Sequence, residues 1–155
     1  MRFLEYTVRN RIQRKQLLMH ENPEIILVDH CAEFRVALKK LLCQRFPGAH
    51  VSEANDASAA MLAAGNAVPD VLIFDLEADP FGSASVVNLV RRAGDGVIVI
   101  ALSGYAYLEY QQAASDRSAD LFFCKSADGF ADDMIRGMER CFTSNAPLQY
   151  LNVAP

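Results

Sequence analysis

Four short runs of consecutive apolar residues constrain most strongly what this chain can fold into. A strand with one face in water alternates apolar and polar residues, so a continuous apolar run indicates a strand buried on both faces. None of the runs approaches the roughly 18–20 residues that span a bilayer, so no membrane span is predicted. They are strand-length segments at 25–28, 71–74, 97–102 and 121–124.

Helical patterns separate these runs. Phe34, Leu38 and Leu42 recur at helical spacing in the segment 34–46, and Pro47 is a stop signal. A weak strand with one apolar position, Val51, is expected next. Alternating strands and helices favour an α/β fold, specifically a flavodoxin-like, doubly wound, five-stranded parallel sheet of order 2-1-3-4-5 with helices on both faces. The weak strand covers 50–53, and the remaining helices are expected over 56–64, 83–92, 107–117 and 127–142.

Charge divides the chain unevenly. Residues 1–22 carry five Lys/Arg and two acids, a net charge of +3, whereas residues 23–155 carry ten basic and seventeen acidic residues, a net charge of −7. The regular pattern covers 24–143, so 1–23 is predicted to be a basic helix or tail and 144–155 a C-terminal tail. An acidic body would be repelled by phosphate backbones, which argues against nucleic-acid binding by this domain.

Cysteine usage indicates a reducing compartment. The four cysteines form no CxxC or other metal-ligand spacing, and no signal peptide is predicted. We therefore expect a cytoplasmic protein with free thiols packed as small apolar groups.

Polar residues follow four of the predicted strands. They are Asp29 with His30, then Asp75, Ser103 and Lys125. The carboxyl ends of parallel strands meet at one edge of the sheet, where such folds bind ligands. This set suits phosphoryl transfer, because a carboxylate can act as the nucleophile, a second can help to hold Mg²⁺, and an ammonium and a hydroxyl can bind phosphoryl oxygens.

Four short motifs carry a resemblance to a known family. In order they read IILVDH at 25–30, VLIFDL at 71–76, ALSGY at 101–105 and FFCKS at 122–126. Steps of 46, 28 and 22 residues separate Asp29, Asp75, Ser103 and Lys125. With these motifs and spacings the chain resembles the receiver domain of bacterial response regulators (the CheY-like superfamily). It looks most similar to the subfamily that usually carries a LuxR-type helix-turn-helix output domain.

The resemblance implies a role for each residue of the site. Asp75 would be the phosphoacceptor of a two-component phosphorelay, taking a phosphoryl group from a histidine kinase or phosphotransfer protein. Ser103 and Lys125 would bind the phosphoryl oxygens. Asp29, Asp75 and the backbone carbonyl of Glu77 would be ligands of Mg²⁺.

The resemblance also implies how a signal would leave the site. Phe122 stands at the position of the switch aromatic, although plain core packing explains it equally well. The face formed by the helix over 107–117, the strand over 121–124 and the helix over 127–142 would signal to partners. The oligomeric state is left open, and any homodimer is expected at this face. The chain is thus expected to be a signalling module and not an enzyme. It either acts through partner contacts alone or belongs to a longer regulator.

Two departures from the family pattern favour an alternative. His30 replaces the second acidic residue that usually binds Mg²⁺, and imidazole is a poor ligand for this ion, so weak Mg²⁺ binding is expected. Glu33, about one turn further on, would compensate only if it points inward. The loop after Asp75 also reaches its proline, Pro80, one residue later than usual. The alternative is a pseudo-receiver, an interaction or dimerisation module that does not depend on phosphorylation.

Two other readings are weaker. A softer-metal site of His30, Cys31 and Asp75 would need adjacent residues to bind one metal. A flavin-binding or small-molecule enzyme on the same fold would need a Ser/Thr/Gly-rich phosphate loop after the first strand, and the residues 30–33 do not provide one.

Overall fold

The computed structural model describes residues 22–143 apart from 67, 79–82, 94–95 and 117. The predicted N-terminal helix or tail over 1–23 lies almost wholly outside the described residues, and the predicted tail over 144–155 lies entirely outside them. Within the described part, no helix has both the length and the apolar character needed to cross a bilayer.

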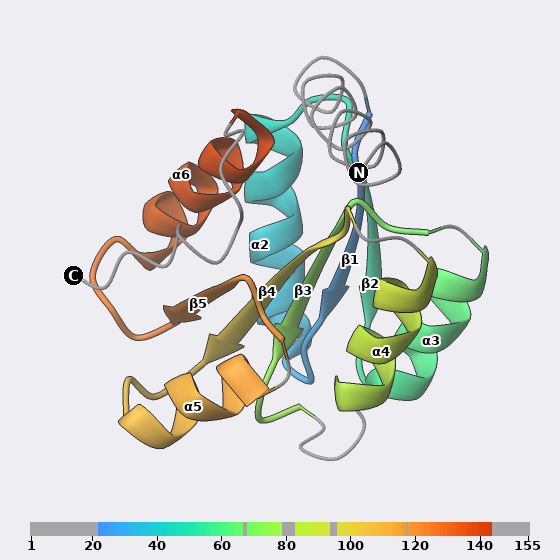
Figure 1. Ribbon diagram of the computed structural model, residues 1–155. Coiled ribbons are helices and arrows are strands. Elements are labelled where there is room, and N and C mark those ends of the chain that lie inside the picture. The colour runs from blue at the N-terminus through green and yellow to red at the C-terminus, as the bar shows by residue number, and fades with distance from the viewer. Residues whose placement is uncertain (1–21, 67, 79–82, 94–95, 117, 144–155) are drawn as a thin grey trace, which may run out of the picture.

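Five parallel strands form one sheet whose order is β2-β1-β3-β4-β5, which confirms the predicted topology (Figure 1). The weakly predicted strand is β2, which lies at one lateral edge of the sheet and buries only two of its five residues, Val51 and Ala54. An edge strand has less of its surface covered, so its sequence carries a weaker apolar signal. The strands are β1 (Glu24–Val28), β2 (His50–Ala54), β3 (Val71–Asp75), β4 (Ile98–Ser103) and β5 (Leu121–Cys124).

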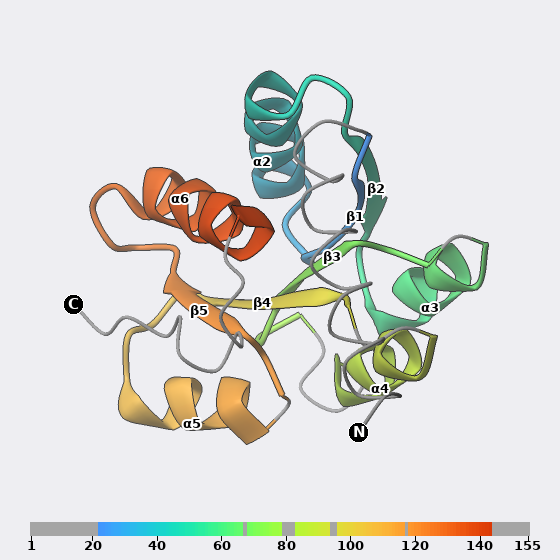
Figure 2. The same cartoon turned by 45° about the horizontal axis from the view of Figure 1, so that its top comes forward.

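Helices cover both faces of the sheet, with α2 and α6 on one side and α3, α4 and α5 on the other (Figure 2). The last helix begins three residues later than the sequence predicts. Gly129 adopts a positive φ of 72°, a left-handed conformation that a continuous right-handed helix excludes. The helices are α2 (Ala32–Arg45), α3 (Ala57–Asn66), α4 (Ser83–Ala93), α5 (Leu108–Asp116) and α6 (Phe130–Thr143).

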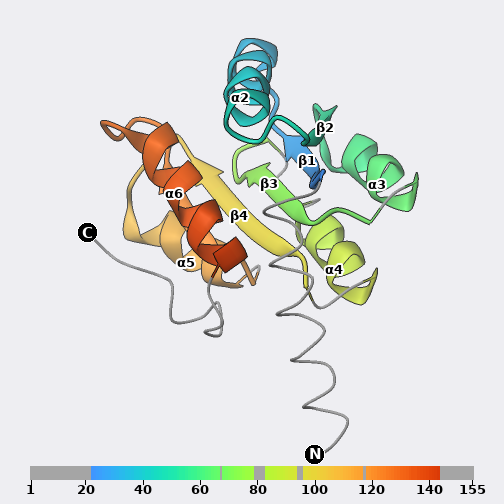
Figure 3. The ribbon, with the colours of Figure 1, turned by 90° about the horizontal axis from the view of Figure 1, so that it is seen from above.

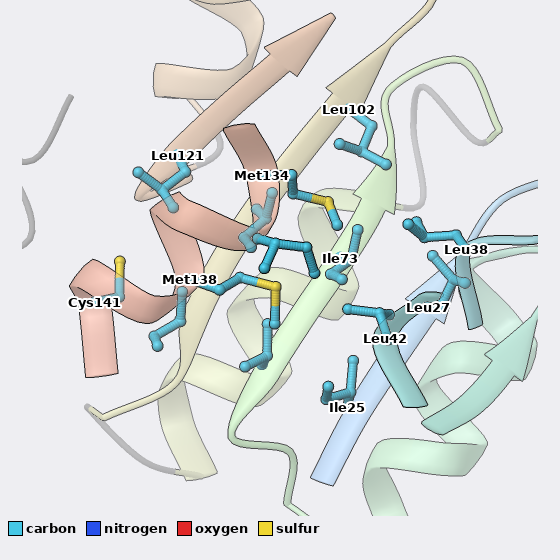
Figure 4. Close-up of a cluster of buried hydrophobic side chains, with 14 of the residues drawn as sticks. Ile25, Leu27, Leu38, Leu42, Ile73, Leu102, Leu121, Met134, Met138 and Cys141 are labelled. Carbon is cyan, nitrogen blue, oxygen red and sulfur yellow. The ribbon is translucent and has the colours of Figure 1, made fainter. Parts of the chain in front are cut away.

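The two faces are packed with side chains of different size. Large residues such as Leu42, Ile73 and Met134 fill the core beneath α2 and α6 (Figure 4). The opposite core is built mostly from alanine and valine, for example Ala60 and Val90. Smaller side chains allow the helices on that face to pack closer to the sheet.

One glycine lets α6 approach β5 closely. A Cβ atom at Gly137 would lie 2.9 Å from the ring of Phe123 and 3.2 Å from Leu121. Edge-to-face contact between Phe46 and Phe142 joins α6 to the end of α2, and the two helices lie on the same face of the sheet (Figure 3). This packing fixes β5, and with it the residue that follows β5, against the rest of the sheet.

Candidate functional site

The strand order brings four strand ends together. Strands β1, β3, β4 and β5 are successive neighbours, and all run in the same direction. In the register, Val28 pairs with Phe74 and Asp75 pairs with Leu102. Asp29 and Asp75 therefore lie at one level, with Ser103 one residue further along, at the edge toward which the arrowheads in Figure 1 point.

Lys125 lies between two buried carboxylates. Its Nζ is 2.6 Å from Oδ2 of Asp29 and 3.1 Å from Oδ2 of Asp75, and neither aspartate side chain has any exposed surface. Burial alone would lower the pKa of Lys125, but hydrogen bonds and attraction from both aspartates outweigh it and raise this pKa. The ammonium also lies 4.6 Å from the centre of the Phe34 ring, a cation–π contact. The lysine is therefore held as a cation at the centre of the site.

Backbone amides hold the two carboxylates in place. Oδ1 of Asp29 accepts a hydrogen bond from the amide of Cys31 at 2.8 Å, and Oδ1 of Asp75 accepts one from the amide of Glu77 at 3.1 Å. The amide of Lys125 donates to the carbonyl of Ser103 at 2.7 Å. All four strand ends thus take part in hydrogen bonds with the main chain, which limits how far the charged groups can move.

Asp75 is an unusual carboxylate. Burial, followed by a hydrogen bond with the Glu77 side chain, raises its pKa from 3.8 to about 6, against the opposing pull of Lys125. A buried carboxylate whose pKa is raised in this way, next to other charged groups, is a candidate functional group. At neutral pH it is still mostly ionised, as a nucleophile must be.

His30 contacts Oδ2 of Asp75, the oxygen that Lys125 also contacts, from the solvent side. Its Nδ1 lies 3.1 Å from Oδ2 of Asp75 and 3.9 Å from Oδ1 of Asp29, and 63% of the side chain is exposed. Among the described residues, these three form a group whose potential ligand atoms all lie within 4.8 Å of one another. The sequence anticipated all three members.

The donor set fits a divalent cation in part. Asp29 and Asp75 provide the oxygen ligands that Mg²⁺ prefers, and they outnumber the one lysine between them. The third member of the group, His30, provides nitrogen, which suits Mg²⁺ poorly.

The thiol of Cys31 lies 3.4 Å from Glu33 and is not a member of this group, so the structure does not assemble the softer-metal site of His30, Cys31 and Asp75. Pro80, the proline that comes one residue later than is usual in the family, lies outside the described residues, as does Asp79.

Ser103 forms a hydrogen bond with the side chain of Glu77, a residue for which the sequence predicts a different role. Its hydroxyl donates to Oε1 of Glu77 at 2.5 Å, and the amide of Gly104 donates to Oε2 of the same carboxylate at 3.1 Å. Burial alone would raise the pKa of Glu77. These two hydrogen bonds, together with one between the Glu77 and Asp75 side chains, outweigh burial and lower this pKa. We expected Glu77 to contribute only its backbone carbonyl. The available signal was a long acidic side chain two residues after Asp75, next to a strand end that carries a hydroxyl.

Ser103 also connects the site to α5. Its Oγ accepts a hydrogen bond from the amide of Tyr105 at 3.0 Å, and the Tyr105 ring stacks on the rings of Tyr107 and Tyr110. Phe122 is half-buried and packs against the core on the α3–α5 face. The predicted switch position is therefore occupied by a partly packed aromatic ring one strand away from Ser103.

Comparisons with known proteins identify the fold. Neither the protein-family models nor the curated proteins contain a match. Among solved structures, the chemotaxis response regulator CheY4 of Vibrio cholerae is 20% identical, with a TM-score of 0.66 over 77% of this chain and 98% of that one. A LuxR-family two-component response regulator from Aurantimonas sp. SI85-9A1 is 22% identical, with a TM-score of 0.66 over 79% and 86%.

A third similar structure contains a modified residue and bound groups. It is a response regulator from Burkholderia pseudomallei with a phosphorylated aspartic acid, a calcium ion and citrate. It is 20% identical, with a TM-score of 0.63 over 74% of this chain and 65% of that one. The chain has the fold of CheY-like receiver domains.

Proposed function

We propose that this protein is the receiver of a two-component phosphorelay and that Asp75 accepts the phosphoryl group. The observation that carries the proposal is the placement of Asp75. It is a buried carboxylate at the carboxyl edge of a receiver-type sheet, and it shares the ammonium of Lys125 with a second buried carboxylate, Asp29.

The proposed reaction is a direct transfer. A carboxylate oxygen of Asp75 attacks the phosphorus of a phosphohistidine on a kinase or phosphotransfer protein. The P–N bond breaks, its electron pair stays with the leaving imidazole, and an acyl phosphate forms on Asp75. Lys125, already 3.1 Å from Asp75, offsets negative charge on the phosphoryl oxygens, and the hydroxyl of Ser103 donates to one of them.

Asp29, Asp75 and the backbone carbonyl of Glu77 are the groups that would hold Mg²⁺. When bound, the ion would neutralise charge on the transferring phosphoryl group. Because His30 stands where a third carboxylate would strengthen the site, we expect this binding to be weak.

Output is proposed to run through α5, β5 and α6. When Ser103 moves toward a phosphoryl group, the bond from the Tyr105 amide transmits the movement to the start of α5. Phe122, on β5, would then change its packing. This face is the proposed contact for a downstream protein or a second copy of the chain, in the cytoplasm and without direct nucleic-acid binding. The signalling unit would be residues 24–143.

The proposal is tested by intact-mass spectrometry after incubation with acetyl phosphate and Mg²⁺. The expected result is a gain of one phosphoryl group in the wild type and none in Asp75→Ala. The proposal fails if the wild type gains nothing even at high Mg²⁺, or if Asp75→Ala gains as much as the wild type.

A pseudo-receiver is the second candidate. It is favoured by His30 at the metal position and by the Glu77 carboxylate on the donors of Ser103 and Gly104. Undetectable Mg²⁺ binding, together with partner binding that is unchanged in Asp75→Ala, would support this alternative over the first.

A further inference from the structure

We propose that the Glu77 carboxylate is an internal ligand of the phosphoryl-oxygen donors and that it must leave before Asp75 can be phosphorylated. The inference rests on the proposed function, because it concerns how access to the same site is controlled. It makes Glu77 a gating residue, in addition to any role of its backbone carbonyl.

The contacts of Glu77 define this role. Its two carboxylate oxygens take the hydroxyl of Ser103 at 2.5 Å and the amide of Gly104 at 3.1 Å, one donor each. Ser103 is fully buried, so its hydroxyl has no solvent partner that could replace the carboxylate. An anion with two oxygens therefore already satisfies these two donors at the end of β4, the strand that pairs with the one ending at Asp75.

The main chain places this carboxylate beside Asp75. The amide of Glu77 donates to Oδ1 of Asp75 at 3.1 Å, so the residue that fills the donors is tied to the residue that is to be modified. A phosphoryl group on Asp75 would present its oxygens to the same edge of the sheet. Both anions cannot accept the same hydroxyl proton, so one of them has to give way.

Charge adds to the competition. Asp29, Asp75 and Glu77 bring three carboxylates to a site in which Lys125 is the ammonium that contacts the two aspartates. An incoming phosphodonor adds further negative charge. Moving Glu77 outward both frees the two donors and removes a repulsive charge from the path of the phosphoryl group. Phosphorylation should therefore be slow with Glu77 in place and faster without it.

The test compares Glu77→Ala and Glu77→Gln with the wild type and with Glu33→Gln. Glu33 is a matched charge control, because it is a nearby exposed glutamate that contacts Cys31 and neither of the two donors. Intact mass is followed over time with acetyl phosphate and Mg²⁺. We expect phosphorylation of Glu77→Ala to be about tenfold faster or more, the equivalent of one charge-assisted hydrogen bond. Glu77→Gln, which keeps one acceptor, should be intermediate, and Glu33→Gln should match the wild type.

A second measurement needs no phosphorylation. Without any phosphodonor, exchange of the Gly104 amide proton with solvent, read by NMR, should be faster in Glu77→Ala than in the wild type and Glu33→Gln. Unchanged exchange would overturn the inference. Equal phosphorylation of wild type and Glu77→Ala would overturn it while leaving the proposed function intact. No phosphoryl gain in any variant would overturn both.

Discussion

Charged side chains gather at both edges of the sheet, and the two clusters are built differently. At the amino edge, Arg91 of α4 pairs with Asp120, the residue before β5, at 2.8 Å. The same guanidinium donates to the carbonyls of Val97 and Ser118, and the same carboxylate accepts from the amide of Val99 at 2.7 Å. One positive and one negative charge thus meet, with main-chain partners on both sides.

The cluster at the carboxyl edge is unbalanced. Asp29 and Asp75 share the ammonium of Lys125. The side chains of Glu77 and His30 also interact with the carboxylate of Asp75. A structural ion pair has no reason to keep like charges together, whereas a site that must receive an anion or a cation does. The comparison indicates that the amino edge is a balanced pair that stabilises the fold, whereas the carboxyl edge holds like charges together, as the proposed phosphoryl transfer would require.

Breaking the amino-edge cluster should have the largest effect on stability. Arg91→Met keeps the length of the side chain but leaves the mostly buried carboxylate of Asp120 without its cation and two carbonyls without a donor. We expect the free energy of unfolding to fall by about 2–4 kcal/mol. Urea denaturation at neutral pH would measure it. A loss below about 0.5 kcal/mol would contradict a structural role for this pair.

Removing the charge of Asp75 should have the opposite sign. Because the pKa of Asp75 is raised to about 6 in the folded protein, the folded state favours its protonated form, and ionisation costs stability as the pH rises. Asp75→Asn is therefore expected to stabilise the metal-free protein by about 1–3 kcal/mol at pH 7.5. The gain should be absent below pH 4, appear between pH 4 and 6, and stay constant above that range.

Thermal unfolding in EDTA at several pH values would test this dependence. Asp120→Asn is the matched control, because the same exchange at the amino edge removes a carboxylate from a balanced pair and should destabilise. If both variants lose stability at pH 7.5, the two edges do not differ in the way described.

The sequence predicts the sheet better than it predicts the details of the site. Continuous apolar runs end at Asp29, Asp75 and Ser103 because a doubly covered parallel sheet leaves polar residues only at its edges, and this is enough to bring those groups together. The side-chain contacts of Glu77 depend on its own rotamer and on Ser103, which lies 26 positions away on a neighbouring strand. A local sequence pattern contains neither piece of information. The start of α6 was placed too early for a similar reason, since the backbone conformation of Gly129 is not a matter of periodicity.

Changing His30 to aspartate would sharpen the comparison further, by making the carboxyl edge still more negative. Nδ1 of His30 lies 3.1 Å from Oδ2 of Asp75, so a carboxylate at position 30 would join Asp29 and Asp75 as an oxygen ligand. We expect His30→Asp to tighten Mg²⁺ binding by about tenfold, because the site gains a charge and a preferred ligand type. Calorimetric titration would measure it, with His50→Asp, at the other edge of the sheet, as the control. Equal affinity in wild type and His30→Asp would show that this position does not face the ion.

The smallest effect is expected at Glu33, and it decides whether the carboxyl edge already compensates for His30. Glu33 lies in the first turn of α2, but its carboxylate contacts the thiol of Cys31 and does not belong to the group formed by Asp29, His30 and Asp75. Its influence on an ion at that group is screened by solvent, so Glu33→Gln should change Mg²⁺ affinity by less than about twofold. The same titration measures it. A loss comparable to the gain from His30→Asp would mean that Glu33 turns inward when the ion binds, and the imbalance of this edge would then include a fourth carboxylate.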